Sequence, residues 1–165
     1  MLIKSSFKSR ITDETVHYEY RDVDSDKEIG DRKISSVHGF CFCGDKLVVV
    51  YAEDKGHWTP PGGGVEIGET WQEALVREIK EETNMKVLAQ KIIGVEDNFE
   101  PSGKVVSQTR SVCIVEPYGD FTKDPDGDIT EIKLIDPKDY KKYFDWGENG
   151  DRIMERALEL VKKMR

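Results

Sequence analysis

Residues 63–85 read GGVEIGETWQEALVREIKEETNM, in which a glycine-containing segment is followed by a run of acidic residues. It places Glu78, Glu81 and Glu82 at spacings of three and four residues, which on a helix confines them to about 100° of the surface. Like charges at these spacings destabilise an isolated helix by roughly a few tenths of a kcal/mol per pair, and anions near its C-terminal end oppose the helix dipole. We therefore expect a bound cation to offset the repulsion.

The start of this helix is marked by Thr70, which is followed three residues later by Glu73 in a capping-box pattern. A helix is predicted to begin near Trp71. Its apolar face is expected to pack on a sheet and consists of Leu75, Val76, Ile79 and Thr83. The glycines before the helix allow backbone carbonyls and amides to approach a ligand closely.

Three neighbouring carboxylates suit Mg²⁺ or Mn²⁺, which favour hard oxygen ligands. The alternative is a solvated charged face, which is a common role for a run of charges. Glu73 and Arg77 alternate in sign at i and i+4, as on an ordinary exposed helix, whereas Glu78 and Glu82 repel each other at the same spacing. This contrast and the adjoining glycine loop together favour the metal site.

The spacing of these residues resembles the signature of the Nudix hydrolases. That family's pattern is Gly, five residues, Glu, seven residues, then Arg-Glu-apolar-any-Glu-Glu-any-Gly-apolar, and the chain keeps every charged position from Gly63 to Met85. Asn84 replaces the usual glycine, and we expect it to end the helix in the left-handed conformation at some cost in stability. Residues 58–63 also resemble the family's approach segment, although Thr59-Pro60 is less typical.

The resemblance implies an α/β protein of the α+β type, with a mixed β-sheet sandwiched between helices. It also implies hydrolysis of a phosphoric anhydride bond in a nucleoside diphosphate linked to another moiety, with Mg²⁺ as cofactor and Mn²⁺ as a possible substitute. A catalytically inert domain that binds a nucleotide as a sensor is the alternative. A generic acidic interaction domain is a third reading. Within the enzyme class, the sequence does not distinguish among nucleoside triphosphates, dinucleotides, nucleotide sugars and ADP-ribose as substrate.

The resemblance also assigns site residues. The implied metal ligands are Gly63, through its carbonyl, and Glu78, Glu81 and Glu82. Arg77 and Glu69 are expected to form a pair that orients Glu78. The general base is left open between a signature glutamate and Glu131, which is as well explained as a solvated loop acid. The candidate catalytic residues are therefore Glu69, Arg77, Glu78, Glu82 and Glu131.

The rest of the chain predicts one domain, residues 1–165, in which residues 1–33 extend the core. These extra residues either close over the substrate or form a homodimer interface. Strands are expected at 16–20, 34–43, 47–52, 86–95, 104–116 and 129–136, with a loop at 53–68, a turn at 96–103 and a helix at 151–165.

Charge and cysteine content limit the partners and the compartment. A net charge of -8 and a pI near 5.0 argue against a nucleic-acid polymer as partner, so a small nucleotide derivative is expected. No segment has the length and apolarity of a membrane span, which favours a cytoplasmic protein. Cys41, Cys43 and Cys113 lack zinc-site spacing and are predicted to be reduced, buried thiols.

Aromatic residues and histidines give weaker candidates for ligand contacts. Four aromatic residues are candidates for stacking on a base, although local packing is the commoner role: Trp58, Tyr118, Phe121 and Trp146. His38 and His57 are candidates for phosphate or metal binding. Because His38 falls in a predicted strand, a structural hydrogen bond is its favoured role.

Overall fold

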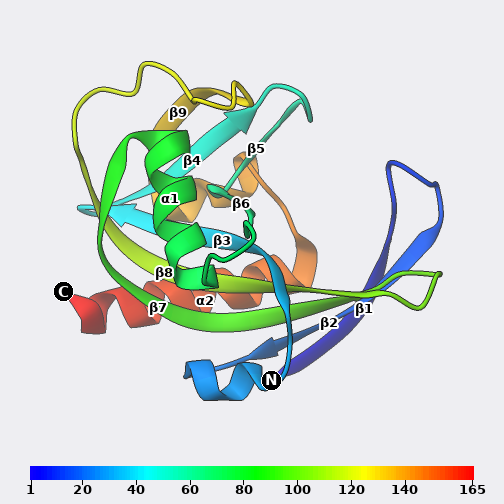
Figure 1. The fold of residues 1–165 in the computed structure, drawn as a ribbon. Coiled ribbons are helices and arrows are strands. Elements are labelled where there is room, and N and C mark those ends of the chain that lie inside the picture. Colours follow the sequence, from blue (N-terminus) through cyan, green and yellow to red (C-terminus); the bar gives the residue numbers. More distant parts are fainter.

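The computed structural model describes residues 1–165, and a mixed sheet of nine strands organises the chain (Figure 1). The strands are β1 (Leu2–Lys8), β2 (Thr15–Asp22), β3 (Ile34–Cys43), β4 (Lys46–Ala52), β5 (His57–Thr59), β6 (Gly62–Gly64), β7 (Met85–Phe99), β8 (Val105–Pro117) and β9 (Ile129–Ile135). The main path runs β1-β2-β7-β8-β3-β4-β5, while β6 pairs with β3 and β9 pairs with β4. Strands β3 and β8 are parallel, and the other pairs are antiparallel.

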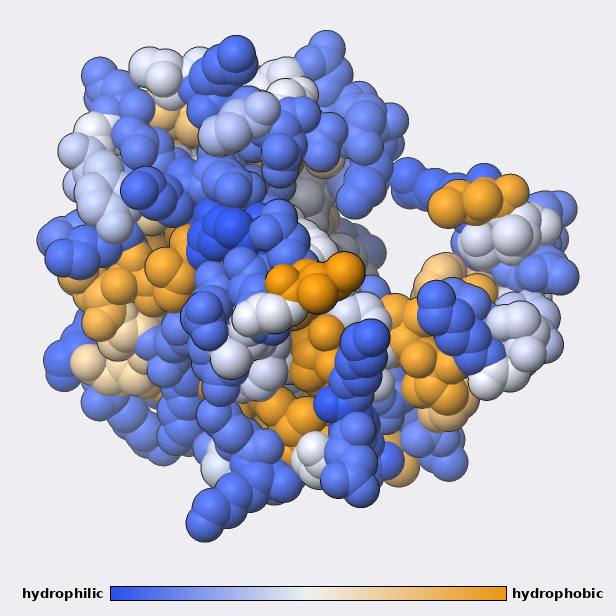
Figure 2. Space-filling model, viewed as in Figure 1, coloured by the Kyte–Doolittle hydropathy of each residue, from blue (hydrophilic) through white to orange (hydrophobic).

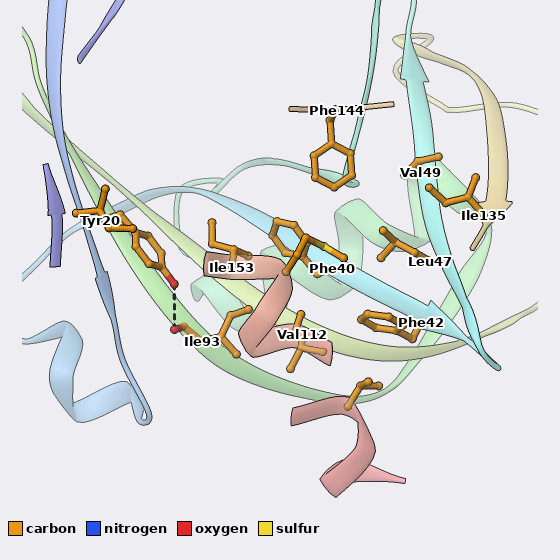
Figure 3. Close-up of a cluster of buried hydrophobic side chains, with 14 residues drawn as sticks. Tyr20, Phe40, Phe42, Leu47, Val49, Ile93, Val112, Ile135, Phe144 and Ile153 are labelled. Carbon is orange, nitrogen blue, oxygen red and sulfur yellow. Dashed lines mark hydrogen bonds between the residues drawn. The ribbon is translucent and has the colours of Figure 1, made fainter. Parts of the chain in front are cut away.

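Two helices cover opposite faces of this sheet, as predicted: α1 (Trp71–Thr83) and α2 (Gly147–Met164). Short 3₁₀ helices η1 (Asp26–Ile29) and η2 (Pro137–Lys142) lie in the connections. In β3, Val37 and Cys41 join the core beneath α1, whereas Phe40 and Phe42 join the core beneath α2. Alternation with a period of two thus supplies both cores from one strand, and Figure 3 shows the α2 side.

Several predicted boundaries are confirmed. The β3–β4 hairpin turns at Gly44, whose φ of +60° suits glycine, and pairs Phe42 with Leu47. Helix α1 begins after Thr70, whose hydroxyl oxygen accepts a hydrogen bond from the Glu73 amide at 3.1 Å. The Glu73 carboxylate accepts from the same hydroxyl instead of from the Thr70 amide, so one half of the predicted capping box is replaced.

Four local predictions are wrong. The predicted loop 53–68 contains β5 and β6, because neighbouring strands supply hydrogen-bond partners for these three-residue segments. The predicted turn at 96–103 is shorter, because residues 96–99 continue β7 and pair with both β2 and β8. Val76 is 40% exposed, because α1 is rotated so that Glu78 and Glu82, rather than Val76, face inward. Helix α2 also begins four residues before the predicted start.

The first two strands form an N-terminal arm, which we define as residues 1–22. Strand β1 pairs with β2, and β2 pairs with β7 over His17–Phe99 to Asp22–Gly94, so the arm extends the sheet. Its outer end projects beyond the body beside the β7–β8 turn (Figure 1). Figure 2 shows hydrophobic surface on this arm and a hollow between it and the body.

All three cysteines are free: Cys41 and Cys113 are buried, and Cys43 is half-buried. Neither of the two α-helices combines the length and apolarity needed to cross a membrane.

Candidate active site

The glycine loop lies against both β3 and α1. Gly62, Gly63 and Gly64 form β6 and pair with residues 36–38 of β3. A Cβ atom on Gly62 would lie 2.1 Å from the Val37 carbonyl oxygen, and one on Gly63 would lie 2.5 Å from the Glu78 carboxylate. Glycine at position 62 therefore lets β6 lie close to β3, and glycine at position 63 lets the backbone lie close to the Glu78 carboxylate.

Arg77 joins the loop to the helix. Its Nε donates to Glu69 Oε2 at 2.7 Å and its Nη2 donates to Glu69 Oε1 at 2.9 Å, which is a bidentate pair. The same Nη2 donates to the Gly64 carbonyl at 2.9 Å, and Nη1 donates to Glu78 Oε1 at 2.9 Å. The hydrogen bonds from Arg77 lower the pKa of Glu69 to about 2, so Glu69 is an anion at neutral pH.

Glu78 and Glu82 face inward from α1, and each is only 9% exposed. Burial raises the pKa of Glu78, although the Arg77 guanidinium opposes this shift. Burial also raises the pKa of Glu82 to about 8, with the nearby charges of Glu78 and Asp124 adding to it. The one hydrogen bond that favours the Glu82 anion comes from the Gly62 amide, which donates to Oε1 at 2.8 Å.

Glu81 lies beside these residues on α1 without entering the same cavity. A cavity of about 190 Å³ is lined by Gly63, Glu78 and Glu82, whereas Glu81 lines a neighbouring cavity with Arg77. Arg77 Nη1 lies 3.3 Å from Glu81 Oε2, so the guanidinium bridges Glu78 and Glu81. As arranged here, no three acidic, histidine or cysteine side chains converge on one point, so the expected convergence of all three glutamates is only partly reproduced.

Helix α1 ends at Asn84 in the left-handed conformation that the sequence predicts, with φ of 54° and ψ of 40°. Its amide donates to the Lys80 carbonyl at 2.9 Å, and its side-chain Nδ2 donates to the Asp120 carbonyl at 3.0 Å. The side-chain bond offsets part of the cost of replacing glycine here, and it ties the helix end to the segment after β8.

The β8–β9 loop supplies acids that the sequence reasoning did not identify. Asp124, Asp126 and Asp128 line the cavity with Glu78 and Glu82. Asp124 is a structural residue, because its carboxylate accepts from the Asp126 and Ile129 amides at 3.0 Å each. Asp126 and Asp128 remain exposed. The spacing of acids in DPDGD signals only a polar turn, so their direction could not be read from sequence.

Glu131 is not brought to this cavity. It lies on β9 opposite Tyr51, its side chain is exposed, and it is absent from the lining. Two residues within the β4–β5 turn were also missed: Asp54 and Lys55 line the cavity, and Lys55 is its one lysine or arginine. The cavity is otherwise strongly acidic.

The donor chemistry of this cavity fits a divalent cation. Its acids are hard oxygen donors, and the cradle between Gly63 and Glu78 would be filled by any Cβ atom at Gly63. A buried carboxylate such as Glu82 is costly to ionise without a positive partner. Glu78, Glu82 and the Gly63 carbonyl, with Glu81 at the margin, are the groups that would hold Mg²⁺.

The four aromatic residues that the sequence offered as base-stacking candidates lie in different places. Trp58 packs against Tyr51 and Tyr143, Phe121 packs against a small cluster around Val50, and Tyr118 lies exposed beside Lys80. Trp146 instead lines a second cavity together with His38.

The two histidines also differ in position. His57 is half-buried, and its Nδ1 lies 3.3 Å from the Trp58 carbonyl oxygen. His38 lines both the acidic cavity and the second cavity. Its Nδ1 lies 3.3 Å from Arg110 Nη1, and burial, with the Arg110 and Lys55 charges, holds its pKa well below the usual range. His38 is therefore neutral at physiological pH.

Comparison with known proteins gives a consistent result. A protein-family model for the NUDIX domain matches residues 32–157. The chain is 40% identical over 84 residues to an ADP-ribose pyrophosphatase of Methanocaldococcus jannaschii, which covers 50% of this chain and 47% of the relative. It is 26% identical over 108 residues to a putative mutator protein, MutT4, of Mycobacterium tuberculosis, covering 65% of this chain and 43% of the relative. The matches thus span about half the length of these relatives.

Solved structures show the same fold at low identity. The Bacillus subtilis pyrophosphohydrolase BsRppH superposes with a TM-score of 0.70 at 21% identity, covering 95% of this chain and 97% of that chain. The NUDIX domain of Shewanella oneidensis NrtR, crystallised with ADP ribose, gives a TM-score of 0.61 at 16% identity, covering 83% and 94%. At these identities the likeness concerns the fold alone.

Proposed function

Because this chain belongs to the Nudix hydrolase family, we propose that it is a divalent-metal-dependent pyrophosphohydrolase acting on a nucleoside diphosphate linked to another moiety. The observation that carries the proposal is the joint placement of Gly63, Glu78 and Glu82 around one acidic cavity, with Glu69 and Arg77 fixing the loop against α1. ADP-ribose is the first substrate to test, because a relative at 40% identity is named an ADP-ribose pyrophosphatase.

Each residue has a defined task in this proposal. Glu78, Glu82 and the Gly63 carbonyl, with Glu81 at the margin of the cavity, would hold Mg²⁺ or Mn²⁺. When bound, the ion supplies charge neutralisation for the diphosphate and lowers the pKa of a coordinated water. Arg77 holds Glu78 Oε1 while Glu69 holds Arg77, so the carboxylate is oriented before substrate arrives.

A further acid is available to accept the proton of the attacking water. Asp126 lines the cavity, and its charge contributes to the raised pKa values of Glu78 and Glu81, although burial is the larger cause for both. We propose Asp126 for this role in place of Glu131, which faces away. Lys55, the one lysine or arginine in the lining, is placed to contact a phosphate oxygen.

The reaction is tested with the purified chain, Mg²⁺ and a panel of ADP-ribose, nucleotide sugars, dinucleotides and nucleoside triphosphates, followed by phosphorus NMR. Hydrolysis of ADP-ribose adds water across the anhydride and yields AMP and ribose 5-phosphate. Glu82→Gln should abolish turnover, while Glu116→Gln, at an exposed glutamate at the end of β8, serves as the matched control. Binding without turnover of any substrate would favour an inert nucleotide-binding domain instead.

A further inference from the structure

A second cavity, of about 410 Å³, lies between the first turn of α2 and the N-terminal arm. Its size falls within the roughly 300–1,000 Å³ range of small-molecule sites. His38 lines both this cavity and the acidic cavity, so the two cavities adjoin at this residue. The inference rests on the proposed function, in which a diphosphate occupies the acidic cavity.

Three nearly buried polar residues line the second cavity: Glu96, Arg110 and Asn149 are 7%, 3% and 4% exposed. Asn149 Nδ2 donates to Glu96 Oε2, and Arg110 Nη2 lies 3.4 Å from the same oxygen. After these contacts, Arg110 Nε and Asn149 Oδ1 have no hydrogen-bond partner. Buried polar groups are seldom left unpaired in folded proteins, so one free donor and one free acceptor beside a cavity point to a ligand.

The chemistry of the lining selects a nucleobase rather than a phosphate. Glu96 already compensates the charge of Arg110, and Asp145 adds a further negative charge, so an anion is disfavoured. The edge of a nucleobase presents a hydrogen-bond acceptor beside a donor, as adenine does with N7 and its N6 amino group. These groups match the free Arg110 donor and the free Asn149 acceptor.

Aromatic rings line the same cavity from two directions. Trp146 belongs to the body and lies over the Arg110 guanidinium at 5.3 Å. Phe7 and Tyr18 belong to the arm, with ring centroids 6.1 Å apart. Phe7 is 46% exposed although it lines the cavity, so a large part of its ring is free for contact. Aromatic faces of this kind can stack on any of the nucleobases, because each base has a flat π-face.

We propose that the N-terminal arm, which lies outside residues 32–157, is part of the substrate pocket and holds the nucleobase against Trp146 through Phe7 and Tyr18 while Arg110 and Asn149 bind its edge. The arm thereby gives this chain a determinant of substrate choice outside the matched domain.

Binding is measured by calorimetry without metal, with AMP as the probe and ribose 5-phosphate as the probe that lacks a base. Neither probe contains an anhydride bond, so binding is measured without turnover. The wild-type chain should bind AMP at least tenfold more tightly than ribose 5-phosphate. Phe7→Ala should weaken AMP binding by about fivefold or more, in line with the loss of one base–aromatic stack, and leave ribose 5-phosphate unchanged. Phe7→Leu, which keeps apolar bulk without the flat ring, should also weaken AMP binding.

Leu2→Ala is the matched control, because Leu2 is on the same strand, is also 46% exposed and does not line the cavity. It should change AMP binding less than twofold. Equal binding of the two probes to wild type, or unchanged AMP binding in Phe7→Ala, would overturn the proposal.

Hydrolysis of every substrate in the panel is followed with Mg²⁺ in parallel to separate the two proposals. Hydrolysis combined with unchanged AMP binding in Phe7→Ala removes the base pocket and leaves the proposed function standing. Weaker AMP binding in Phe7→Ala without hydrolysis supports the pocket and removes the proposed function.

Discussion

Replacing Glu82 by glutamine should stabilise the metal-free protein and abolish its proposed activity. Glu82 is 9% exposed, and burial raises its pKa from an ordinary value of 4.5 to about 8. A raised pKa means that the native state keeps the proton while the unfolded chain releases it. The native state is therefore penalised increasingly as the pH rises from about 4.5 to about 8, and the penalty is absent below the unfolded value.

The size of this penalty follows from the shift. Each pKa unit corresponds to about 1.4 kcal/mol, so at pH 7.5 the wild type loses about 3–5 kcal/mol relative to pH 4.5. Glutamine does not ionise, and its Oε1 can still accept from the Gly62 amide, which lies 2.8 Å from Glu82 Oε1. We expect Glu82→Gln to raise the free energy of unfolding by about 2–4 kcal/mol at pH 7.5, or the melting temperature by about 5–15 °C.

The assay is urea unfolding followed by circular dichroism, in EDTA, at pH 4.5 and pH 7.5. The gain should be below about 1 kcal/mol at pH 4.5, because Glu82 is then protonated in the native state and about half protonated in the unfolded chain, which leaves a penalty of only about 0.4 kcal/mol. Glu116→Gln, with an exposed side chain, should change neither value. If Glu82→Gln raised the free energy of unfolding equally at both pH values, or lowered it at pH 7.5, burial of the Glu82 anion would not destabilise the native state.

Three further predictions concern neighbouring residues. Arg77→Ala should lower kcat/KM by about 10–100-fold while calorimetry still detects Mg²⁺ binding, because Arg77 orients Glu78 without being a ligand; loss of metal binding would contradict that role. Asn84→Ala should lower the free energy of unfolding by about 1 kcal/mol more than Asn84→Gly, because alanine tolerates a φ of 54° poorly; thermal melts showing equal stability would refute this. Asp126→Asn should lower kcat by at least about tenfold, as expected for a general base, whereas Glu131→Gln should not; the reverse order would restore Glu131 as the candidate.

Local sequence signals predicted the elements whose determinants are themselves local. The capping hydroxyl of Thr70 and the left-handed Asn84 fix the two ends of α1 through contacts within a few residues. Apolar alternation likewise identified β3, and the Gly44 turn fixed its hairpin with β4. The family resemblance then supplied the sheet between helices, which no local pattern specifies.

The mispredicted parts depend on contacts distant in sequence. Strand β6 exists because β3 offers partners to three glycines that have little strand propensity of their own. Glu96 and Asp97 resemble turn residues, yet they are buried in β7 because Arg110 and Arg32 pair with them from other segments. Partners that lie far away in the sequence cannot be identified from the residues next to Glu96 and Asp97.

The sequence indicated which residues to consider for the candidate site, but only part of their arrangement. Helical spacing predicted that Glu78 and Glu82 lie on the same side of α1, and both line the acidic cavity. It could not show that Arg77 would bridge Glu78 and Glu81. That Asp126 lines the cavity and Glu131 does not depends on how the β8–β9 loop folds back over the cavity. That path is set by Asp124, whose buried carboxylate holds the amides of Asp126 and Ile129.

The central claim is that Glu78 and Glu82 hold a divalent ion in the acidic cavity. It is tested most directly by titrating the protein with Mn²⁺ and measuring free Mn²⁺ by electron paramagnetic resonance. Wild type and Glu116→Gln should take up Mn²⁺ with equal affinity, and the Glu78→Gln, Glu82→Gln double variant should bind at least about tenfold more weakly. Unchanged uptake by a folded double variant would contradict the claim.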